Sequence, residues 1–223
     1  MRRPGQYRFQ SVLMNKHPSS ERPRAAGLDL LEHLASAMEL QPGCDSFLFV
    51  RHGQTACNAR RIFQGPEEPL DATGQAQAAA CAGLLAATSL ASIVCSDMRR
   101  ARETAAAIAA PHRLRPNPQG GLRERNFGTL IGTSSAQIDW ACAPPLGETL
   151  DGFVQRSCDG LRLALASPQP LLIVAHGGTL HVLAALLRLT LPLELMANAQ
   201  PLQLRRVAGH WTVQALAAGH GAG

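Results

Sequence analysis

The stretch SFLFVRHGQTACN, residues 46–58, joins an apolar run to a compact set of polar side chains. The run FLFV has the length and composition of a strand that is buried in a sheet. A cation, an imidazole, a glycine, a hydroxyl and an amide follow it within one turn, and such groups bind phosphate around a candidate nucleophile. Taken alone, however, Arg51-His52-Gly53 is weak evidence and favours an ordinary loop histidine.

Outward from this stretch, strand-like apolar runs alternate with helical patterns. We expect helices at 74–87, 99–110, 148–166 and 178–188, and strands at 47–50, 90–94, 171–175, 202–207 and 211–216. This alternation predicts the α/β class, as a three-layer α/β/α sandwich around a mainly parallel sheet.

Polar motifs follow three of the predicted strands. They are RHG at 51–53, SDMRR at 96–100 and HGG at 176–178. Ligands of such sheets bind beyond the carboxyl ends of the parallel strands, so we expect the three motifs to meet in one site.

The motifs and their order resemble those of the histidine phosphatase superfamily, whose fold is phosphoglycerate mutase-like. The matching residues are Arg51, His52, Gly53, Thr55 and Asn58; Gln64 and Gly65; Ser96 through Ala105; Leu122, Glu124, Phe127 and Gly128; Gly147, Glu148 and Thr149; and Ala175 through Gly178. The resemblance extends from residue 46 to about residue 207. It implies the same fold and a phosphatase that uses no cofactor and no metal.

The resemblance also implies roles for five catalytic residues. His52 attacks phosphorus as a neutral imidazole, which nearby cations favour because they repel the imidazolium. Arg51, Arg100 and His176 compensate the charge on the phosphoryl oxygens. Glu124 protonates the leaving alcohol and then activates water. A second group is expected to bind the phosphate or the substrate: Thr55, Asn58, Gln64, Gly65 and Gly177.

Four of these residues also have an ordinary structural interpretation. Glu124 is compatible with a surface carboxylate paired with Arg123 or Arg125, and Arg100 with a solvated arginine at a helix start. Asn58 is compatible with a helix cap, and His176 with a packed histidine bonded to a backbone carbonyl.

The segment after Glu124 favours hydrolysis over mutase chemistry. Mutases that resemble the glycolytic enzyme carry E-R-H-Y-G and a long basic insertion, whereas this chain reads ERNFG at 124–128 and soon reaches Gly147. The function expected is a phosphomonoester hydrolase that forms a phosphohistidine on a small metabolite. A phosphoglycerate mutase-type transferase and a catalytically silent phosphate-binding module remain alternatives.

The intervening lid is apolar and lacks basic residues, which predicts a monophosphate with a fairly apolar body. Its apolar side chains are Leu130, Ile131, Ile138, Trp140, Cys142, Pro144, Pro145 and Leu146. The chain departs from the family at Leu130 and Ile131, where a tryptophan and an acid are common, and after Asn198-Ala199. Those departures leave the substrate open: a ribazole monophosphate, a nucleotide or a sugar phosphate.

The domain organisation predicted from composition has four parts. Residues 1–26 are read as a flexible tail, 27–45 as a helix and linker, 46–217 as the catalytic domain, and 218–223 as a flexible end. A helix is expected over 27–40.

Charge and cysteine usage exclude several classes of protein. The formal net charge is +5, but the cations are scattered and aromatic residues are few, so nucleic-acid binding is not expected. No apolar run is long enough for a membrane span, and isolated cysteines favour a cytoplasmic location. A metal site of His52, Glu124, His176 and His181 is disfavoured because the arginines would repel a dication. The partner expected is a small-molecule phosphomonoester, and a homodimer is among the oligomeric states left open.

Overall fold

The computed structural model describes residues 25–216, in which six strands form one mixed sheet. The strands are β1 (Ser46–Arg51), β2 (Ser92–Ser96), β3 (Asn117–Gln119), β4 (Leu171–Ala175), β5 (Pro201–Val207) and β6 (His210–Ala215). Their order is β3-β2-β4-β1-β5-β6. The first four strands in this order pair in parallel, whereas β5 pairs antiparallel with both of its neighbours, β1 and β6. The predicted mainly parallel sheet is therefore confirmed.

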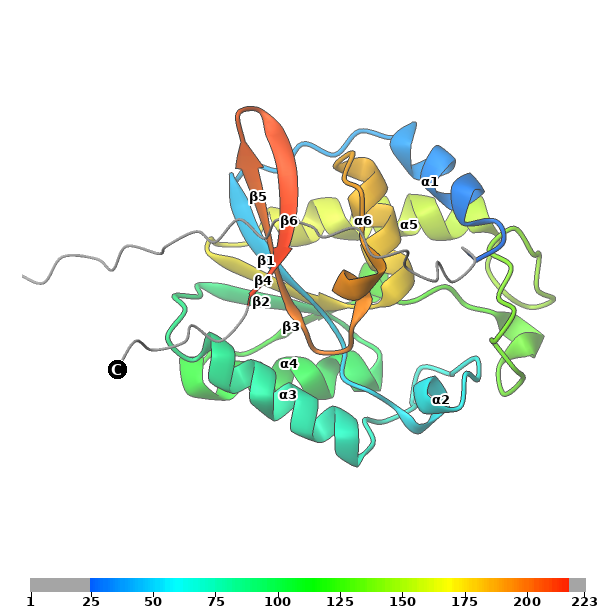
Figure 1. Cartoon of the computed structure of the whole chain (residues 1–223), viewed down its shortest axis with the longest axis horizontal. Helices are drawn as coiled ribbons and strands as arrows, with labels where there is room; N and C mark the ends of the chain where they lie inside the picture. The colour runs from blue at the N-terminus through cyan, green and yellow to red at the C-terminus, as the bar shows by residue number, and fades with distance from the viewer. Residues whose placement is uncertain (1–24, 217–223) are drawn as a thin grey trace, which may run out of the picture.

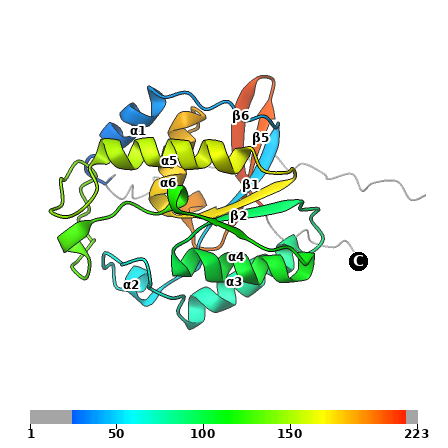
Figure 2. The ribbon, with the colours of Figure 1, turned by 180° about the vertical axis from the view of Figure 1, so that it is seen from behind.

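Helices cover both faces of this sheet (Figures 1 and 2). One face carries α1 (Leu28–Ser36), α5 (Leu150–Leu165) and α6 (Gly177–Leu186), and the other carries α3 (Ala72–Leu85) and α4 (Arg99–His112). A short helix, α2 (Ala56–Ala59), follows β1. The chain forms the predicted three-layer sandwich.

Side-chain alternation along β1 divides the core between these two layers. Phe47 and Phe49 pack in the cluster that contains the buried residues of α1, α5 and α6. Leu48 and Val50 pack in the cluster that contains those of α3 and α4. Because successive side chains of a strand point to opposite faces, an uninterrupted apolar run marks a strand buried on both faces, as the sequence predicted.

Several predicted boundaries differ from the observed ones by a few residues, and one strand was not predicted. The helix expected to 40 ends at Ser36, whose hydroxyl donates to the His33 carbonyl and so competes with the helical backbone pattern. The helix α3 begins two residues early because the Asp71 side chain accepts from the Gly74 backbone N–H at 2.7 Å. The strand expected at 90–94 lies at Ser92–Ser96. The sequence Asn-Pro-Gln gave no strand signal for β3, which forms only by pairing with β2.

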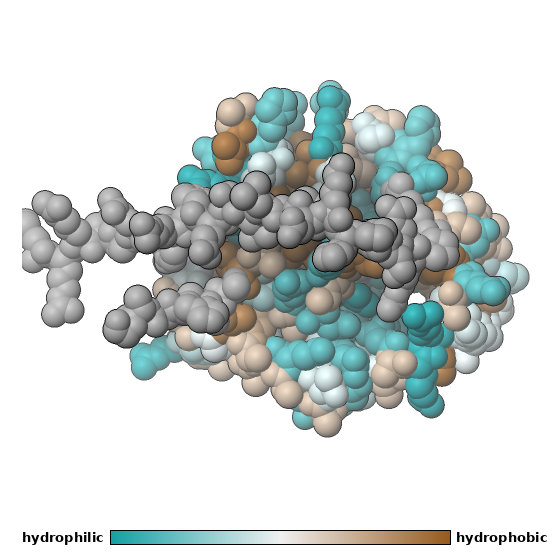
Figure 3. All heavy atoms as spheres, viewed as in Figure 1, coloured by the Kyte–Doolittle hydropathy of each residue, from teal (hydrophilic) through white to brown (hydrophobic). Residues whose placement is uncertain are grey.

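The ends of the predicted domain scheme lie partly outside the described residues. These ends are 1–24 and 217–223, which include most of the tail predicted for 1–26 and all of 218–223. Ala26, at the end of that tail, forms a β-bridge with Asp139. On the face seen in Figure 3, hydrophilic and hydrophobic residues are interspersed over the coloured surface. None of the helices between residues 25 and 216 has the length and apolar character of a membrane span.

Candidate active site

The two motif histidines lie side by side at the carboxyl edge of the sheet. His52 directly follows β1, and His176 directly follows β4. These strands are parallel neighbours in which Arg51 lies opposite Ala175, and the His52 N–H donates to the Ala175 carbonyl at 2.9 Å. The ring centroids are 5.1 Å apart. The prediction that the strand ends meet in one place is confirmed by this register.

Hydrogen bonds on both ring nitrogens determine the tautomer of His52. Its Nδ1 lies 2.7 Å from the Gly53 carbonyl oxygen, which can only accept, so Nδ1 carries the proton. Arg100 Nε donates to His52 Nε2 at 3.2 Å, so Nε2 carries the lone pair. Burial, followed by Arg100 and Arg51, holds the pKa of His52 well below its usual value. The imidazole is therefore neutral near pH 7, with its nucleophilic nitrogen beside a guanidinium.

Arg100 is a buried cation rather than a solvated arginine at a helix start. It is 1% exposed, donates to the Gly65 carbonyl at 2.9 Å, and contacts Met98 Sδ at 3.1 Å. Burial lowers its pKa to about 10, which leaves it charged near neutral pH. Arg99 beside it is exposed and pairs with Glu103, so the two successive arginines have different environments.

Arg51 and His176 each present a buried nitrogen that has no hydrogen-bond partner among the described residues. These atoms are Arg51 Nε and His176 Nδ1. Each residue also makes one hydrogen bond: Arg51 Nη1 donates to the Met196 carbonyl at 2.7 Å, and His176 Nε2 lies 2.8 Å from Ser96 Oγ. His176 is therefore bonded to a hydroxyl and not to a backbone carbonyl. Buried polar atoms normally have partners, so these two nitrogens mark a site for an acceptor-rich ligand.

Burial also lowers the pKa of both residues. For His176 the lowering is large, with Arg100, His52 and Arg51 contributing after burial. For Arg51 the nearby carboxylate of Glu124 opposes the effect of burial. The site thus joins two neutral imidazoles to two guanidiniums, a set suited to a phosphoryl group.

Glu124 is anchored to backbone amides rather than paired at the surface. Its Oε2 accepts from the Gly178 N–H at 2.9 Å, and its Oε1 accepts from the Arg125 N–H at 3.0 Å. Arg123 instead pairs with Asp97 at 2.7 Å. The side chain of Arg125 donates to backbone carbonyls of Trp140, Cys142 and Glu148. The surface-pair interpretation of Glu124 is therefore wrong.

Of the five residues predicted to bind the phosphate or the substrate, two support neighbouring residues and three line the adjoining cleft. Thr55 is buried and caps α2, because it accepts from the Asn58 N–H at 3.0 Å and donates to Gln64 Oε1 at 3.0 Å. Thr55, and not Asn58, is thus the helix cap. Gly65 supplies the carbonyl that holds Arg100. Asn58, Gln64 and Gly177 line the adjoining cleft.

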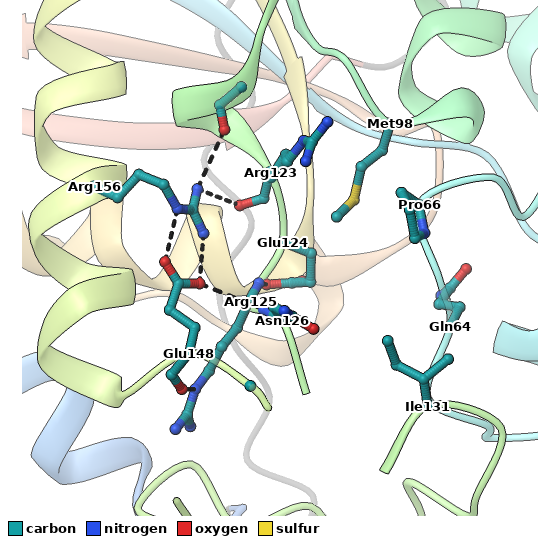
Figure 4. A pocket seen from close by; sticks show the side chains of 12 residues that line it. Gln64, Pro66, Met98, Arg123, Glu124, Arg125, Asn126, Ile131, Glu148 and Arg156 are labelled. Atoms are coloured by element: carbon teal, nitrogen blue, oxygen red, sulfur yellow. Dashed lines mark hydrogen bonds and ion pairs between the residues drawn. The ribbon is translucent and has the colours of Figure 1, made fainter. Parts of the chain in front are cut away.

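Two pockets of about 520 and 280 Å³ form the cleft, and Gln64, Glu124 and Arg125 line both. The smaller contains Arg51, Asn58 and Gly177 among mainly apolar side chains: Ala25, Ile62, Phe63, Phe127, Ile138, Trp140 and Met196. In the larger, the Arg156–Glu148 ion pair faces Met98, Pro66 and Ile131 (Figure 4). His52 and His176 line neither pocket, since they are only 2% and 0% exposed.

Sequence reasoning missed several residues that hold the site. Ser96 and Gly178 lay within the quoted motifs without a role, and the motif context was the signal available for them. Asn198 was noted only as a departure from the family, yet its Nδ2 donates to the His52 carbonyl at 2.8 Å. Arg156 carried no sequence signal. It donates to the Gly121 and Arg123 carbonyls, both at 3.0 Å, and so supports the segment that ends at Glu124.

Comparisons with known proteins identify the family of this chain. The sequence model of the histidine phosphatase superfamily (branch 1) matches residues 47–218. The glucosyl-3-phosphoglycerate phosphatase of Mycobacterium tuberculosis is 33% identical, over 74% of this chain and 85% of its own length. The mycobacterial enzyme of that name solved in complex with VO3 has a TM-score of 0.64 at 30% identity, over 78% of this chain and 100% of its own.

A second kind of relative is much longer than this chain. An agropine synthesis reductase of Rhizobium rhizogenes is 32% identical over 82% of this chain. The match covers 44% of that protein, so the chain spans less than half of its length.

Proposed function

We propose that this chain, which belongs to the histidine phosphatase superfamily (branch 1), is a phosphatase that hydrolyses a small phosphomonoester through a phosphohistidine on His52. The observation that carries the proposal is the set of nitrogens around His52. Its Nε2 lone pair faces Arg100, and the buried Nε of Arg51 and Nδ1 of His176 need hydrogen-bond acceptors. A phosphoryl group bound there supplies those acceptors and places phosphorus against the nucleophile.

The first half-reaction transfers the phosphoryl group to the enzyme. His52 Nε2 forms a bond to phosphorus while the bond from phosphorus to the alcohol oxygen breaks. Arg51, Arg100 and His176 offset the negative charge on the phosphoryl oxygens as it spreads during transfer. Glu124 supplies the proton that the leaving alcohol needs.

The second half-reaction returns the enzyme to its starting state. Glu124 takes a proton from water as the water oxygen bonds to phosphorus and the phosphorus–nitrogen bond breaks. Inorganic phosphate leaves, and His52 again has a lone pair at Nε2, because the Gly53 carbonyl keeps its proton on Nδ1.

The walls of the larger pocket support hydrolysis of a substrate with one phosphate. Arg156 is bonded to both oxygens of Glu148, and Arg123 to both oxygens of Asp97. The charge of each arginine is already neutralised by a carboxylate, so a second phosphate or a carboxylate on the substrate would gain little binding free energy there. Apolar side chains such as Ile62 and Phe63 in the smaller pocket support the expectation of a partly apolar body. Glucosyl-3-phosphoglycerate is the compound in the name of the mycobacterial relatives. It belongs in the substrate panel because its carboxylate tests whether a second anionic group is accepted.

The test is p-nitrophenyl phosphate hydrolysis by the wild type and by His52→Ala, with chelator present, followed by a panel of natural monophosphates. We expect turnover to fall at least about 1,000-fold in His52→Ala. His210→Ala, which removes an exposed imidazole on β6, is the matched control and should retain activity.

Rapid quenching identifies the intermediate. Acid-labile, alkali-stable phosphate on the wild type but not on His52→Ala supports the phosphohistidine. Turnover that survives His52→Ala would rule out that nucleophile. Phosphate binding without turnover of any substrate in the panel would favour the silent module, and transfer to a glycerate hydroxyl would favour the mutase.

A further inference from the structure

Ser96 and His176 are neighbours because of the parallel pairing of β2 with β4. Cys95 lies opposite Val174 in this pairing, so the residues that follow them reach the carboxyl edge of the sheet together. Ser96 is fully buried at that edge, and its Oγ lies 2.8 Å from His176 Nε2. The chemistry described above assigns no task to this hydroxyl.

The direction of that hydrogen bond follows from the other partner of Ser96. Its Oγ accepts from the Met98 backbone N–H at 3.2 Å, and among the described residues it makes only these two hydrogen bonds. The hydroxyl proton therefore has His176 Nε2 as its acceptor. If Nε2 carried a proton instead, the buried hydroxyl would have no acceptor, which costs free energy.

We propose that Ser96 is a positioning residue that fixes the tautomer of His176 with the proton on Nδ1. The proposal rests on the proposed function in one respect, which is that His176 contacts the phosphoryl group. In this tautomer the buried Nδ1, which has no partner in residues 25–216, is a donor suited to a phosphoryl oxygen. In the opposite tautomer Nδ1 would present a lone pair to that oxygen and repel it.

The charge state of the ring is consistent with this assignment. Burial and the nearby cations hold the pKa of His176 well below its usual value, so the free enzyme contains a neutral ring with one proton. A neutral ring has one donor and one acceptor nitrogen, and the partner of one nitrogen decides the role of the other.

The two imidazoles thus carry the proton on the same nitrogen but use opposite sides of the ring. In His52 the Gly53 carbonyl holds Nδ1–H, and Nε2 is left as the nucleophile. In His176 the Ser96 hydroxyl holds Nε2, and Nδ1–H is left as a donor. The Gly53 carbonyl therefore leaves His52 as the nucleophile, and the Ser96 hydroxyl leaves His176 as a hydrogen-bond donor.

The experiment records two-dimensional ¹⁵N–¹H spectra of the ring nitrogens in histidine-labelled wild type, Ser96→Ala and Ser157→Ala. His176 signals are assigned with His176→Asn. Ser157 is the matched control because its hydroxyl is equally buried and makes no hydrogen bond with the described residues. We expect Nδ1–H in the wild type and in Ser157→Ala, and a mixture or Nε2–H in Ser96→Ala.

Affinity for inorganic phosphate gives a second measurement. We expect Ser96→Ala to bind it about three- to tenfold more weakly, as for loss of one hydrogen bond, and Ser96→Thr, which keeps a hydroxyl, to recover part of the loss. Ser157→Ala should match the wild type.

The wild-type spectrum alone can overturn the proposal, even if Ser96→Ala does not fold. A proton on Nε2 of His176 in the wild type would do so, as would an unchanged tautomer in folded Ser96→Ala. A changed tautomer with unchanged phosphate affinity would retain the tautomer assignment and remove His176 from the phosphoryl site. Failure of the phosphohistidine test with His52→Ala would leave the spectroscopic result standing.

Discussion

The floor and the rim of the active site are built in different ways. The floor consists of Arg51, His52, Ser96, Arg100 and His176, which follow or end strands of the sheet or begin the next helix. Ladder hydrogen bonds fix its backbone, and His52, Arg100 and His176 are at most 2% exposed. The rim is the segment 123–149, which is largely irregular and includes Leu146 at 88% exposure.

The rim is held by side chains that bond to its backbone. Arg125 donates to three rim carbonyls, and Arg156 of α5 donates to the Arg123 carbonyl and to the Glu148 carboxylate. The two regions meet where Glu124 of the rim accepts from the Gly178 N–H at the start of α6. In the proposed function, the floor acts on the phosphoryl group, whereas the rim supplies the proton donor and contacts the leaving group.

The largest effect should come from the floor. Arg100→Met keeps much of the side-chain volume but removes the donor beside His52 Nε2 and one cation from the phosphoryl site. We expect kcat/KM to fall about 1,000-fold, at the upper end of the effect of losing one transition-state donor. The matched change Arg99→Met, at the exposed neighbour, should cost less than about twofold. Similar losses in both variants would contradict the division between floor and surface.

The effect of a substitution in the rim should depend on the leaving group of the substrate. Glu124→Gln removes the proton donor, so we expect kcat/KM to fall about 100-fold for alkyl phosphates. In the first half-reaction p-nitrophenolate needs no proton, so the burst with p-nitrophenyl phosphate should persist. Affinity for inorganic phosphate should not weaken, because the floor is unchanged. Equal loss of the burst with both kinds of substrate would place Glu124 outside proton transfer.

A substitution at the contact between the floor and the rim should cause a smaller and more specific loss of activity. A Cβ at Gly178 would overlap Glu124 Oε1 and crowd Trp140, so Gly178→Ala must displace the carboxylate. We expect about a tenfold loss for alkyl phosphates and less for the p-nitrophenyl ester. Gly83→Ala, on α3 with nothing within 4 Å of its Cβ, serves as the control.

A double-mutant cycle tests whether this effect passes through Glu124. Gly178→Ala should add little further loss to Glu124→Gln, because the displaced group is then already inactive. Additive losses would mean that Gly178→Ala acts through general disruption of α6.

The floor should also make stability depend on pH. The pKa values of His52 and His176 are well below 6.5 in the folded protein, so the unfolded chain binds more protons as pH falls below 6.5. The free energy of unfolding should therefore decrease from pH 6.5 downward, until the lowered folded pKa values are reached. Each histidine contributes up to about 1.4 kcal/mol per pH unit. Urea unfolding between pH 5 and 7 measures this slope, and His52→Asn should reduce it; an unchanged slope would contradict the neutral buried imidazole.

Much of the fold and of the floor could be predicted from local sequence signals. The apolar runs at 47–50 and 171–175 marked strands buried on both faces, and the polar motifs after them marked one site. The rim could not be predicted in this way. The irregular segment has no periodicity, and nothing in the sequence of α5, the helix that follows it, shows that Arg156 bonds back to this segment. The assignment of the acidic residue at 124 depended on the family resemblance alone.

The sequence by itself determined the order of the longer helices and of every strand except β3, and which side chains reach the carboxyl edge, because both follow from apolar periodicity. Only the tertiary structure decided how those side chains differ. Arg99 and Arg100 are adjacent in sequence, yet one is solvated and the other buried against His52. His52 and His176 each precede a glycine, yet a carbonyl holds one ring and a hydroxyl the other. Burial and hydrogen-bond partners arise from segments far apart in the chain, and these contacts set charge, tautomer and reactivity.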